Sequence, residues 1–374
     1  MVEISVVDIL IIVLKAALVM GALLHLAAMV TWVERKGSAL IQNRVGANRA
    51  AIFGFDLAGI LNTLLCDPVK AITKEDFLPK GTTQFMHSLA PFLAVFPIVV
   101  SFAVVPFGPP IQFADRTVSL QLADLNVGLL YVFAMGSLAV YGVVLAGWVS
   151  NNKFALFGSL RATAQMISYE VTMGLSIVGL IAAYQTLDLN SIVQQQSGTI
   201  FGFLPKWGIF FFFPLNVISF FLFFTSMMAE TKRAPFDLPE SESELAAGYF
   251  TEYSGMKFLL FWLGEFAEIV VASSIITVLF FGGWQLPYID LAKVGWSPVI
   301  PGTSLFEVPW GSILGAAVFG AKVSFFAVLQ VVIRWTLPRF RYDQLMNLCW
   351  KGMLPLSLTT VVASVWALLY FGKP

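Results

Sequence analysis

Long uninterrupted stretches of apolar residues divide the chain into eight windows. Each window is long enough for a helix that crosses a bilayer, which needs about 20 residues. The apolar residues are continuous rather than alternating with polar ones, so helices are favoured over a membrane β-barrel. We therefore predict an all-α integral membrane protein, a single polytopic domain over residues 1–374 with about eight transmembrane helices. The windows are 9–33, 87–107, 125–150, 162–184, 208–229, 256–283, 310–335 and 353–371.

The composition agrees with a membrane protein. Hydrophobic residues make up 58% of the chain and charged residues only 12%, whereas a soluble domain carries about 25% charged residues. Basic and acidic residues number 22 each, so the net charge gives no reason to expect a nucleic-acid partner. The acidic Glu3 and Asp8, and the length of the first window, argue against a signal peptide.

Lysine and arginine are distributed unequally between the two sides of the predicted membrane. The segments after windows 1, 3, 5 and 7 carry sixteen of them, and the opposite side carries four. Because cytoplasmic loops are enriched in these residues, the odd-numbered loops are assigned to the cytoplasm. Both termini are then predicted to lie outside.

The first cytoplasmic segment, residues 34–86, contains a second kind of helix signal. Leu57, Ile60, Leu61, Leu64 and Leu65 recur at helical spacing, with polar residues on the opposite face. This pattern predicts a short amphipathic helix over about 55–66 that lies in the membrane interface. The alternative is a helix that only caps the bundle by packing.

Five lysine and glutamate residues lie well inside the apolar windows, away from their ends. Because a charge in the membrane is costly, such residues are by default candidates for function. We expect Glu170 and Glu265 to handle protons, whereas Lys15 and Glu268 could equally extend toward the interface. A structural alternative is ion pairing, for instance of Lys322 with a carboxylate of the sixth window.

An acidic segment at about 230–255 follows the fifth window. Pro235 and Pro239 prevent the preceding helix from continuing, and Ser241 with Glu244 could form a capping box. Crowded carboxylates raise one another's pKa, which would suit proton exchange, but a solvated acidic loop is an equal alternative from these features alone. The carboxylates are Asp237, Glu240, Glu242, Glu244 and Glu252.

The chain offers little for a bound cofactor. Its two cysteines, Cys66 and Cys349, are far apart, and neither His25 nor His87 has a partner at ligand spacing. There is also no dinucleotide or phosphate-loop motif. We expect no metal, no covalently bound cofactor and no catalytic residue in this chain alone, although a lipophilic redox substrate could bind from the bilayer.

Several motifs of the cytoplasmic segments occur in a fixed order between residues about 30 and 355. They are Glu34-Arg-Lys, Gln42-Asn-Arg-Val-Gly, Asp67-Pro-Val-Lys70, Gly147-Trp-Val-Ser-Asn-Asn-Lys153, Gln165-Met-Ile-Ser-Tyr-Glu170, the acidic segment Ala229–Leu245, and Leu337-Pro-Arg-Phe-Arg-Tyr-Asp-Gln-Leu-Met346. Together they resemble the H-subunit family of bacterial NADH–quinone oxidoreductase (respiratory complex I), whose mitochondrial counterpart is subunit 1.

The resemblance implies a multi-pass subunit of the bacterial inner (plasma) membrane in a proton-translocating enzyme of the respiratory electron-transport chain. Quinone (ubiquinone or menaquinone) would be the substrate, while NADH, FMN and Fe–S clusters would belong to partner subunits of the peripheral arm. The other partners would be membrane-arm subunits and lipid. In the family, this subunit forms the quinone tunnel and links quinone reduction to proton translocation.

The resemblance also carries roles to individual positions. Arg35, Arg44 and Arg334 match arginines that line the quinone tunnel. The carboxylates expected to couple quinone reduction to proton movement are Glu34, Asp67, Glu170, Glu230, Asp237, Glu240, Glu242, Glu244, Glu252 and Glu265.

Two departures and three alternatives remain. Ala47 stands where Pro is common in the family, and Glu268 where a neutral residue is frequent, which leaves the local proton wiring open. The main alternative is the homologous subunit of a membrane-bound hydrogenase or another complex that does not use quinone. A stand-alone transporter is disfavoured because no internal repeat is visible, and a purely structural anchor is the third possibility.

Overall fold

The computed structural model describes residues 6–48, 59–113, 116–200, 202–239, 241–289, 291, 296–298 and 307–372. Within these ranges seven helices are long and apolar enough to cross a membrane, which confirms the predicted all-α membrane class. They correspond to α1 (Val6–Ile41), α3 (Gln84–Ser101), α4 (Gly128–Val149), α5 (Lys153–Tyr184), α9 (Gly255–Phe280), α10 (Trp310–Thr336) and the continuous helical stretch α11 (Tyr342–Asn347), a π-turn and α12 (Leu354–Phe371).

The fifth predicted window forms a shorter helix. α7 (Leu215–Glu230) has 16 residues and is about 24 Å long, less than the ~30 Å of a bilayer's hydrocarbon core. Pro214 precedes it, and Gly208–Phe210 forms only a 3₁₀ turn. The window was therefore correctly placed, but its first seven residues lead into the helix instead of belonging to it.

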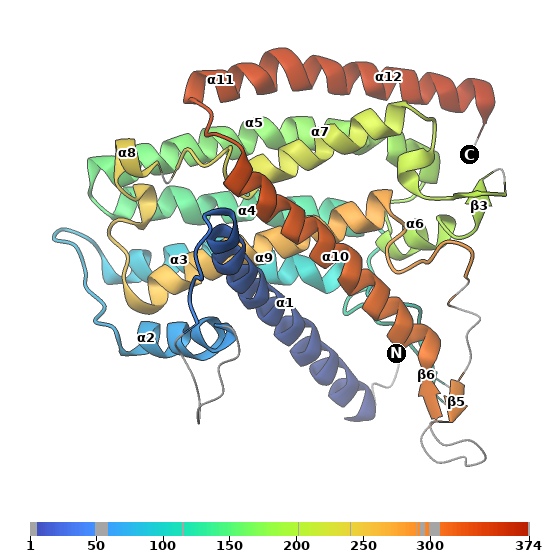
Figure 1. Ribbon diagram of the computed structural model, residues 1–374, viewed down its shortest axis with the longest axis horizontal. Coiled ribbons are helices and arrows are strands. Elements are labelled where there is room, and N and C mark those ends of the chain that lie inside the picture. The colour runs from blue at the N-terminus through green and yellow to red at the C-terminus, as the bar shows by residue number, and fades with distance from the viewer. Residues whose placement is uncertain are drawn as a thin grey trace.

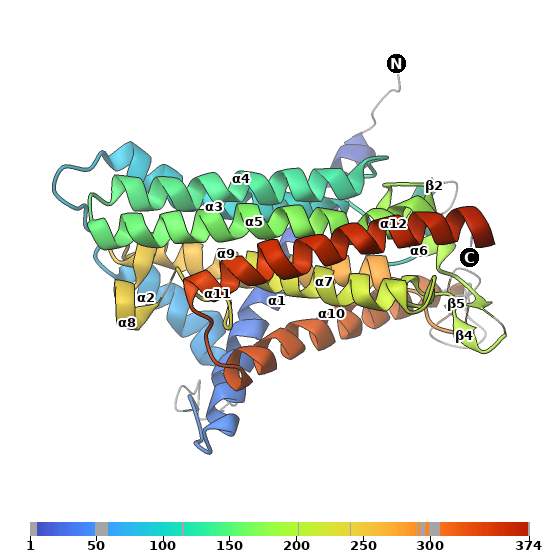
Figure 2. The same cartoon turned by 90° about the horizontal axis from the view of Figure 1, so that it is seen from above.

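α9 lies at the centre of the arrangement. It packs against α1, α3, α7 and α10, and 89% of its apolar window is buried, compared with 6% for α1. α3, α4, α5, α7, α9 and α12 run alongside one another, while α1 and α10 cross them obliquely (Figure 1, Figure 2). α9 is therefore the core helix, and α1 is a peripheral helix with an exposed apolar surface.

The helices begin and end where local chemistry allows it. The side chain of Asn152 accepts a hydrogen bond from the backbone N–H of Phe154 and so caps α5. The same helix ends at Gln185, whose backbone is left-handed with φ of 57°. α5 starts nine residues before the predicted window because these nine residues include Lys153 and Arg161 and are less apolar.

The two ends of the molecule differ. One end carries α2 (Asp67–Thr73) and α8 (Glu242–Leu245), and the other carries α6 (Leu189–Gln195) and three small antiparallel hairpins (Figure 1). The hairpins pair β1 (Ile111–Phe113) with β2 (Arg116–Val118), β3 (Thr199–Ile200) with β4 (Leu204–Pro205), and β5 (Trp296–Pro298) with β6 (Glu307–Pro309). The start of α1 and the end of α12 both lie toward the hairpin end, as expected for termini on the same side; which side is outside stays a prediction.

The predicted amphipathic helix is only partly within the described residues. Residues 55–58 lie outside them, Asn62–Cys66 forms a π-helical turn, and α2 continues the helix to Thr73, beyond the predicted end. The helix packs on α9, while Val69 and Ile72 remain exposed. An apolar surface left open in this way is compatible with the interfacial position, which remains a prediction.

Close packing of α3 on α4 depends on one glycine. A Cβ added at Gly142 would lie 2.4 Å from the backbone nitrogen of Ala94, which cannot move away as a flexible side chain could. On the same helix, a Cβ at Gly136 would meet no atom within 4 Å. A side chain at position 142 would therefore force α3 and α4 apart, whereas one at position 136 would not.

We predict that Gly142→Ala lowers the free energy of unfolding by about 1–3 kcal/mol, the usual cost of overpacking. Gly136→Ala should be neutral or stabilising because alanine has the higher helix propensity. Thermal unfolding of the detergent-solubilised protein measures both. Equal midpoints for the two variants would show that the contact between α3 and α4 is not the constraint described.

Candidate functional site

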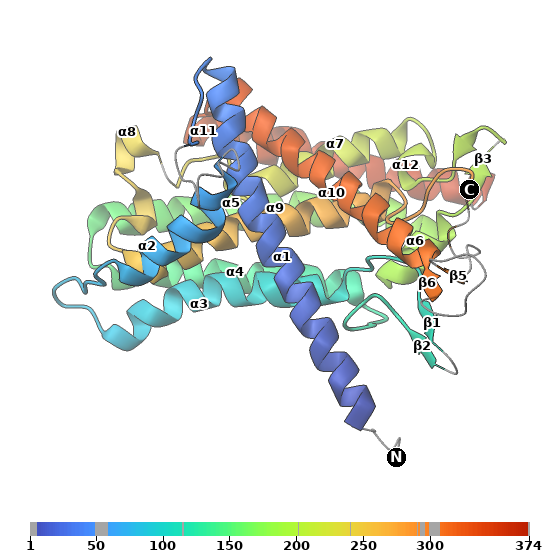
Figure 3. The same ribbon diagram turned by 60° about the horizontal axis from the view of Figure 1, so that its bottom comes forward.

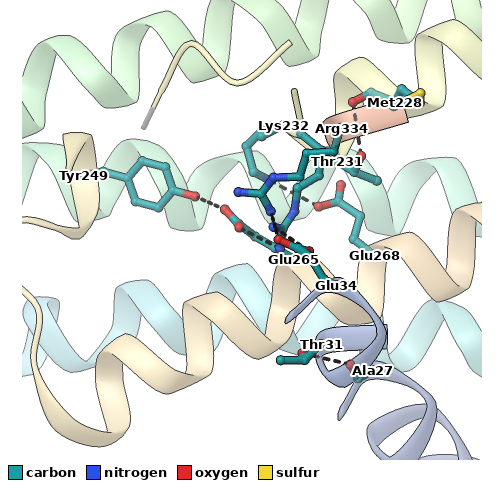
Figure 4. Close-up of polar contacts among 11 residues, drawn as sticks. Ala27, Thr31, Glu34, Met228, Thr231, Lys232, Tyr249, Glu265, Glu268 and Arg334 are labelled. Carbon is teal, nitrogen blue, oxygen red and sulfur yellow. Dashed lines mark hydrogen bonds and ion pairs between the residues drawn. The ribbon is translucent and has the colours of Figure 1, made fainter. Parts of the chain in front are cut away.

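Three segments distant in the sequence meet at a buried carboxylate. Glu34 lies in the last turns of α1, where it forms an ion pair with Arg334 of α10 (Figure 4). Its second oxygen lies 3.4 Å from Arg233, which comes from the segment after α7. α1 was predicted to end at residue 33, but apolar residues follow Glu34-Arg-Lys and the helix continues to Ile41. Glu34 and Arg35 are therefore held on a rigid element instead of a loop.

Arg233 joins Glu34 to the core helix. Its guanidinium also lies 3.4 Å from a carboxylate oxygen of Glu265 on α9 and 4.2 Å from the ring centroid of Phe266. The other oxygen of Glu265 accepts a hydrogen bond of 2.9 Å from the hydroxyl of Tyr249. All of these side chains are buried, so the predicted proton-handling residue Glu265 is also a member of an ion pair.

A second buried pair lies one helical turn further along α9. Lys232 is 3.2 Å from Glu268, so Glu268 points into the protein and does not extend to the interface (Figure 4). Burial alone would lower the pKa of Lys232, but the carboxylates of Glu268, Glu265 and Glu230 outweigh that effect and raise it. Lys232 is therefore a permanent cation at neutral pH.

A small cavity of about 50 Å³ continues this row of charges. It is lined by Glu170, Glu230, Glu268 and Ser137 together with apolar side chains of α3, α4, α5, α7 and α9. Ser137 of α4 donates a hydrogen bond to Glu170 of α5. One oxygen of Glu230 is buried without a hydrogen-bond partner among the described residues. The cavity has room for about three water molecules, which could serve that oxygen.

The charges of this row do not balance. Five carboxylates (Glu34, Glu170, Glu230, Glu265 and Glu268) face three cations (Lys232, Arg233 and Arg334) among the described residues. An uncompensated buried charge is expensive, and a buried group becomes neutral by binding a proton when no partner is present. Among the described residues, the row therefore has two more acidic side chains than basic ones.

The acidic segment is folded into the protein. Phe236, Asp237 and Leu238 are buried, and the amide of Gln165 donates hydrogen bonds to the carbonyls of Ala229 and Phe236. The alternative of a solvated loop is therefore wrong for this part of the segment.

The carboxylate of Asp237 is buried within this segment. It pairs with Arg339 at 2.9 Å. Burial raises the pKa of Asp237 to about 6, against the opposing attraction of Arg339. Arg339 also approaches the hydroxyl of Ser241 at 3.4 Å, and Ser241 makes no side-chain cap to α8, so the expected capping box with Glu244 is wrong.

The remaining carboxylates of the segment lie nearer the surface. Glu244 pairs with Arg161 at 2.6 Å and is half exposed, and Glu252 accepts a hydrogen bond of 2.8 Å from Asn152. Glu240 lies outside the described residues, as does the side chain of Glu242. The five predicted carboxylates are thus not one cluster, because Asp237 belongs to the interior while Glu244 and Glu252 hold the segment to α5.

A second cavity, of about 180 Å³, opens between α1, α2 and α9. Arg35, Asp67 and Trp262 stand in its wall: the guanidinium of Arg35 is 2.6 Å from Asp67 and 5.3 Å from the ring centroid of Trp262. The other lining residues are Lys70, Ala71, Lys74, Gly255, Phe258 and Leu259. Cations on one wall and aromatic and aliphatic groups on the other suit an amphiphilic ligand with a polar head.

The three arginines expected to line a quinone tunnel do not share one site. Arg35 lines the second cavity, and Arg334 pairs with Glu34 in the buried row. Arg44 lies beyond the end of α1, where it donates to the side chain of Gln42 at 2.7 Å and is exposed. Of the three, Arg35 alone lines the second cavity as the structure describes it.

Several residues of the site were missed from sequence. Lys232, Arg233 and Arg339 were counted among the basic residues of cytoplasmic loops, where such residues usually act as anchors. The signal that could have identified the first two was their position close behind an apolar window that is followed directly by Glu230. Tyr249 carried no signal, since an aromatic residue near a membrane surface is common.

Lys322 has a different partner from the one considered. It donates to the carbonyls of Phe281, Gly283 and Gln285 at 2.7–2.9 Å, and not to a carboxylate of α9. A cation at the carboxyl end of α9 satisfies carbonyls that lack partners within the helix. Lys322 thus holds the end of α9 to α10.

Comparisons with known proteins agree with these features. The family model described as NADH dehydrogenase matches residues 14–365. The chain is similar to the NADH-quinone oxidoreductase H subunit numbered 2 of Geobacter sulfurreducens, with 42% identity over 95% of this chain and 96% of the relative. It is also similar to the H subunit numbered 1 of Geobacter metallireducens (43% identity, 95% of both chains) and to the H subunit of Bdellovibrio bacteriovorus (38% identity, 95% of both chains).

The raised pKa of Asp237 predicts a pH-dependent stability. The folded-state pKa of about 6 lies above the unfolded value of about 3.9, so its stabilising contribution is complete below pH 3.9 and is lost as the pH rises through 6. Relative to Asp237→Asn, the wild type should lose up to about 3 kcal/mol of unfolding free energy over this interval.

Thermal unfolding of the solubilised wild type and variant between these pH values measures the effect. Asp343→Asn is the matched control, because Asp343 is exposed and also pairs with an arginine. Arg339→Gln removes the guanidinium that lowers the pKa of Asp237. In this variant the loss of stability should therefore extend above pH 6. Parallel stability curves for the wild type and Asp237→Asn would contradict the assignment.

Proposed function

This chain belongs to the H-subunit family of NADH-quinone oxidoreductase, and on that premise we propose that it guides quinone from the bilayer and couples its reduction to proton translocation. The chain is a membrane subunit of an enzyme complex. We assign to it no redox centre of its own, so the electrons come from partner subunits that carry the flavin and Fe–S clusters.

One observation carries the proposal. Glu34 and Arg35 are neighbours on α1, and Arg35 stands in the wall of the second cavity while Glu34 begins the buried row of charges. A change of charge in the cavity therefore acts on a helix that also carries the first carboxylate of the row. The two sites are thus joined by a rigid element.

The second cavity suits the quinone. A quinone has a polar head with two carbonyl oxygens and an apolar isoprenoid tail. Arg35, Lys70 and Lys74 supply cationic donors for the carbonyls, and Phe258 and Trp262 supply apolar surface. The predicted interfacial position of α2 puts this cavity at the depth where a lipid-soluble substrate leaves the bilayer.

The buried row suits the coupling step. Reduction of a quinone to a quinol takes up two electrons and two protons, so negative charge develops before the protons arrive. That negative charge weakens the ion pair between Arg35 and Asp67. It also changes the electrostatic potential at Glu34. Because the five carboxylates outnumber the three cations, a change of charge at Glu34 would favour the movement of a proton toward Glu230 and Glu170.

The acidic segment connects the buried row of charges to α5 and to the residues after α10. Asp237 ties it to Arg339 after α10, and Glu244 and Glu252 tie it to α5 and to the residue that caps α5. Lys232 and Arg233 of the same segment supply two of the three cations of the row. Protonation of Asp237 near pH 6 would weaken its ion pair with Arg339. The segment could then shift and change the positions of Lys232 and Arg233.

The alternative of a hydrogenase-type complex predicts a different ligand. Its corresponding chain would retain the buried carboxylates but would not need a cavity for a quinone. The names of the relatives, which refer to the quinone enzyme, favour quinone, and the first of the following experiments separates the two functions.

Filling the second cavity should weaken quinone use. Ala71 lines the cavity, so Ala71→Phe should raise the KM for quinone about tenfold in the assembled complex, equivalent to about 1.4 kcal/mol of binding. The adjacent Ile72 is 67% exposed, and Ile72→Phe should leave the KM unchanged. Steady-state NADH:quinone reductase assays measure both. If both variants keep the wild-type KM, the cavity does not hold the quinone.

Removing the proton-accepting group at the end of the row should uncouple the enzyme. Glu230→Gln keeps the shape of the side chain but cannot exchange a proton, so proton pumping should fall at least about tenfold while the complex still assembles. Asp343→Asn, at an exposed carboxylate, is the control. Proton uptake by reconstituted vesicles, measured with the quinone reductase rate, tests this. Wild-type pumping by Glu230→Gln would exclude the row as the proton path.

A further inference from the structure

An apolar groove of about 320 Å³ is lined by residues other than those of the two cavities described above. Its volume is in the range of about 300–1,000 Å³ usual for ligand sites. α1 and α10 form its two sides, and residues of α9, the 3₁₀ turn after α3 and the segment before α4 form its floor. The lining residues are Lys15, Leu18, Val19, Ala22, Leu26, Phe102, Phe107, Leu120, Ser274, Ala316, Phe319, Gly320 and Val323.

The groove arises from the crossing of two helices. α1 and α10 approach each other near Gly37 and Val331 and at the ion pair of Glu34 with Arg334. From there they diverge toward the start of each helix (Figure 3). Lys15 is 19 residues before Glu34 and therefore about 28 Å away along α1. The groove is thus a widening wedge that the helices themselves do not fill.

Among the described residues that line the groove, Lys15 is the one that carries a charge. Within the part of the chain that the structure describes, it has no ion pair or hydrogen bond. The neighbouring residues of α1 are exposed and apolar, including Val13, Leu14 and Leu18. A cation at such a position in a membrane is costly unless it reaches an anion or the lipid head groups.

We propose that this groove binds one anionic phospholipid, with an acyl chain along the apolar floor and the phosphate at Lys15. The apolar wall matches a hydrocarbon chain, and the single cation at the rim matches the phosphate charge. A neutral quinone would fill the groove but would leave Lys15 without a partner, so charge favours the lipid. The bound lipid closes the wedge between the first halves of α1 and α10.

Photocrosslinking in the intact complex tests the proposal. The complex is placed in nanodiscs of phosphatidylcholine, with or without phosphatidylglycerol that carries a diazirine in its acyl chain, and labelled peptides are identified by mass spectrometry. Peptides of α1 and α10 should be labelled in the wild type. Lys15→Gln should reduce labelling about fivefold, the effect of one cation near an anionic head group, and Lys15→Arg should retain it.

A second variant tests the groove without changing the charge. A Cβ at Gly320 meets no atom within 4 Å, so Gly320→Leu can occupy the groove without disturbing the packing, and it should abolish the labelling. Gly21→Leu is the matched control, because Gly21 is exposed on α1, also has free space around it and does not line the groove. Its labelling should equal that of the wild type.

Three results would overturn the proposal. Equal labelling by a diazirine phosphatidylcholine would indicate ordinary surrounding lipid. Wild-type labelling in Gly320→Leu would show that the groove is not the site. Displacement of the label by added quinone would assign the groove to the substrate. If Lys15→Gln does not assemble, the comparison of the two lipids in the wild type and the pair of glycine variants still decides the question.

Discussion

A charge buried among apolar helices must meet an opposite charge or bind a proton, and the interior of this protein is organised by that requirement. Glu265 and Glu268 lie on the most deeply buried helix, α9, at positions that lipid could not tolerate. Their cations come from the segment after α7, which must therefore turn inward. The same requirement brings α1 and α10 together, since Glu34 meets both Arg233 and Arg334.

The buried row of charges contains more carboxylates than cations, and this excess bears on its proposed function. A structure that only neutralised its charges would hold equal numbers of each sign, whereas this row, as far as the structure describes it, has two more acids than bases. The excess lies at Glu170 and Glu230, where α4, α5 and α7 surround a cavity that is large enough for water. This is the end of the row toward which we proposed that protons move, while the ion pairs nearer α1 keep the helices in place.

The sequence predicted the helices well because an apolar run of about 20 residues has few other stable states in a membrane. It was less successful at their ends. α1 includes Glu34 and Arg35 because the apolar residues up to Ile41 continue the helix. The helix was predicted to end earlier because the charged triplet Glu34-Arg-Lys is typical of a loop. The sequence made Glu170 and Glu265 candidates because a carboxylate within an apolar run is conspicuous. It did not identify Lys232 or Arg233 as buried, because that depends on contacts such as those of Gln165 with the carbonyls of Ala229 and Phe236, more than sixty residues away in the chain.

The order of these charges along the chain bears on how the protein is made. Glu34, Lys232 and Arg233 are all synthesised before Glu265 and Glu268, and only Arg334 follows them. When α9 leaves the ribosome, the two cations that it needs are already present, some thirty residues upstream. α1, with its exposed apolar surface, can settle in lipid alone, but α9 gains a stable place only once the segment after α7 has turned inward beside it. We therefore expect insertion of α9 to depend on docking of the preceding segment, because without it α9 would carry two acids with no cation beside them in the membrane.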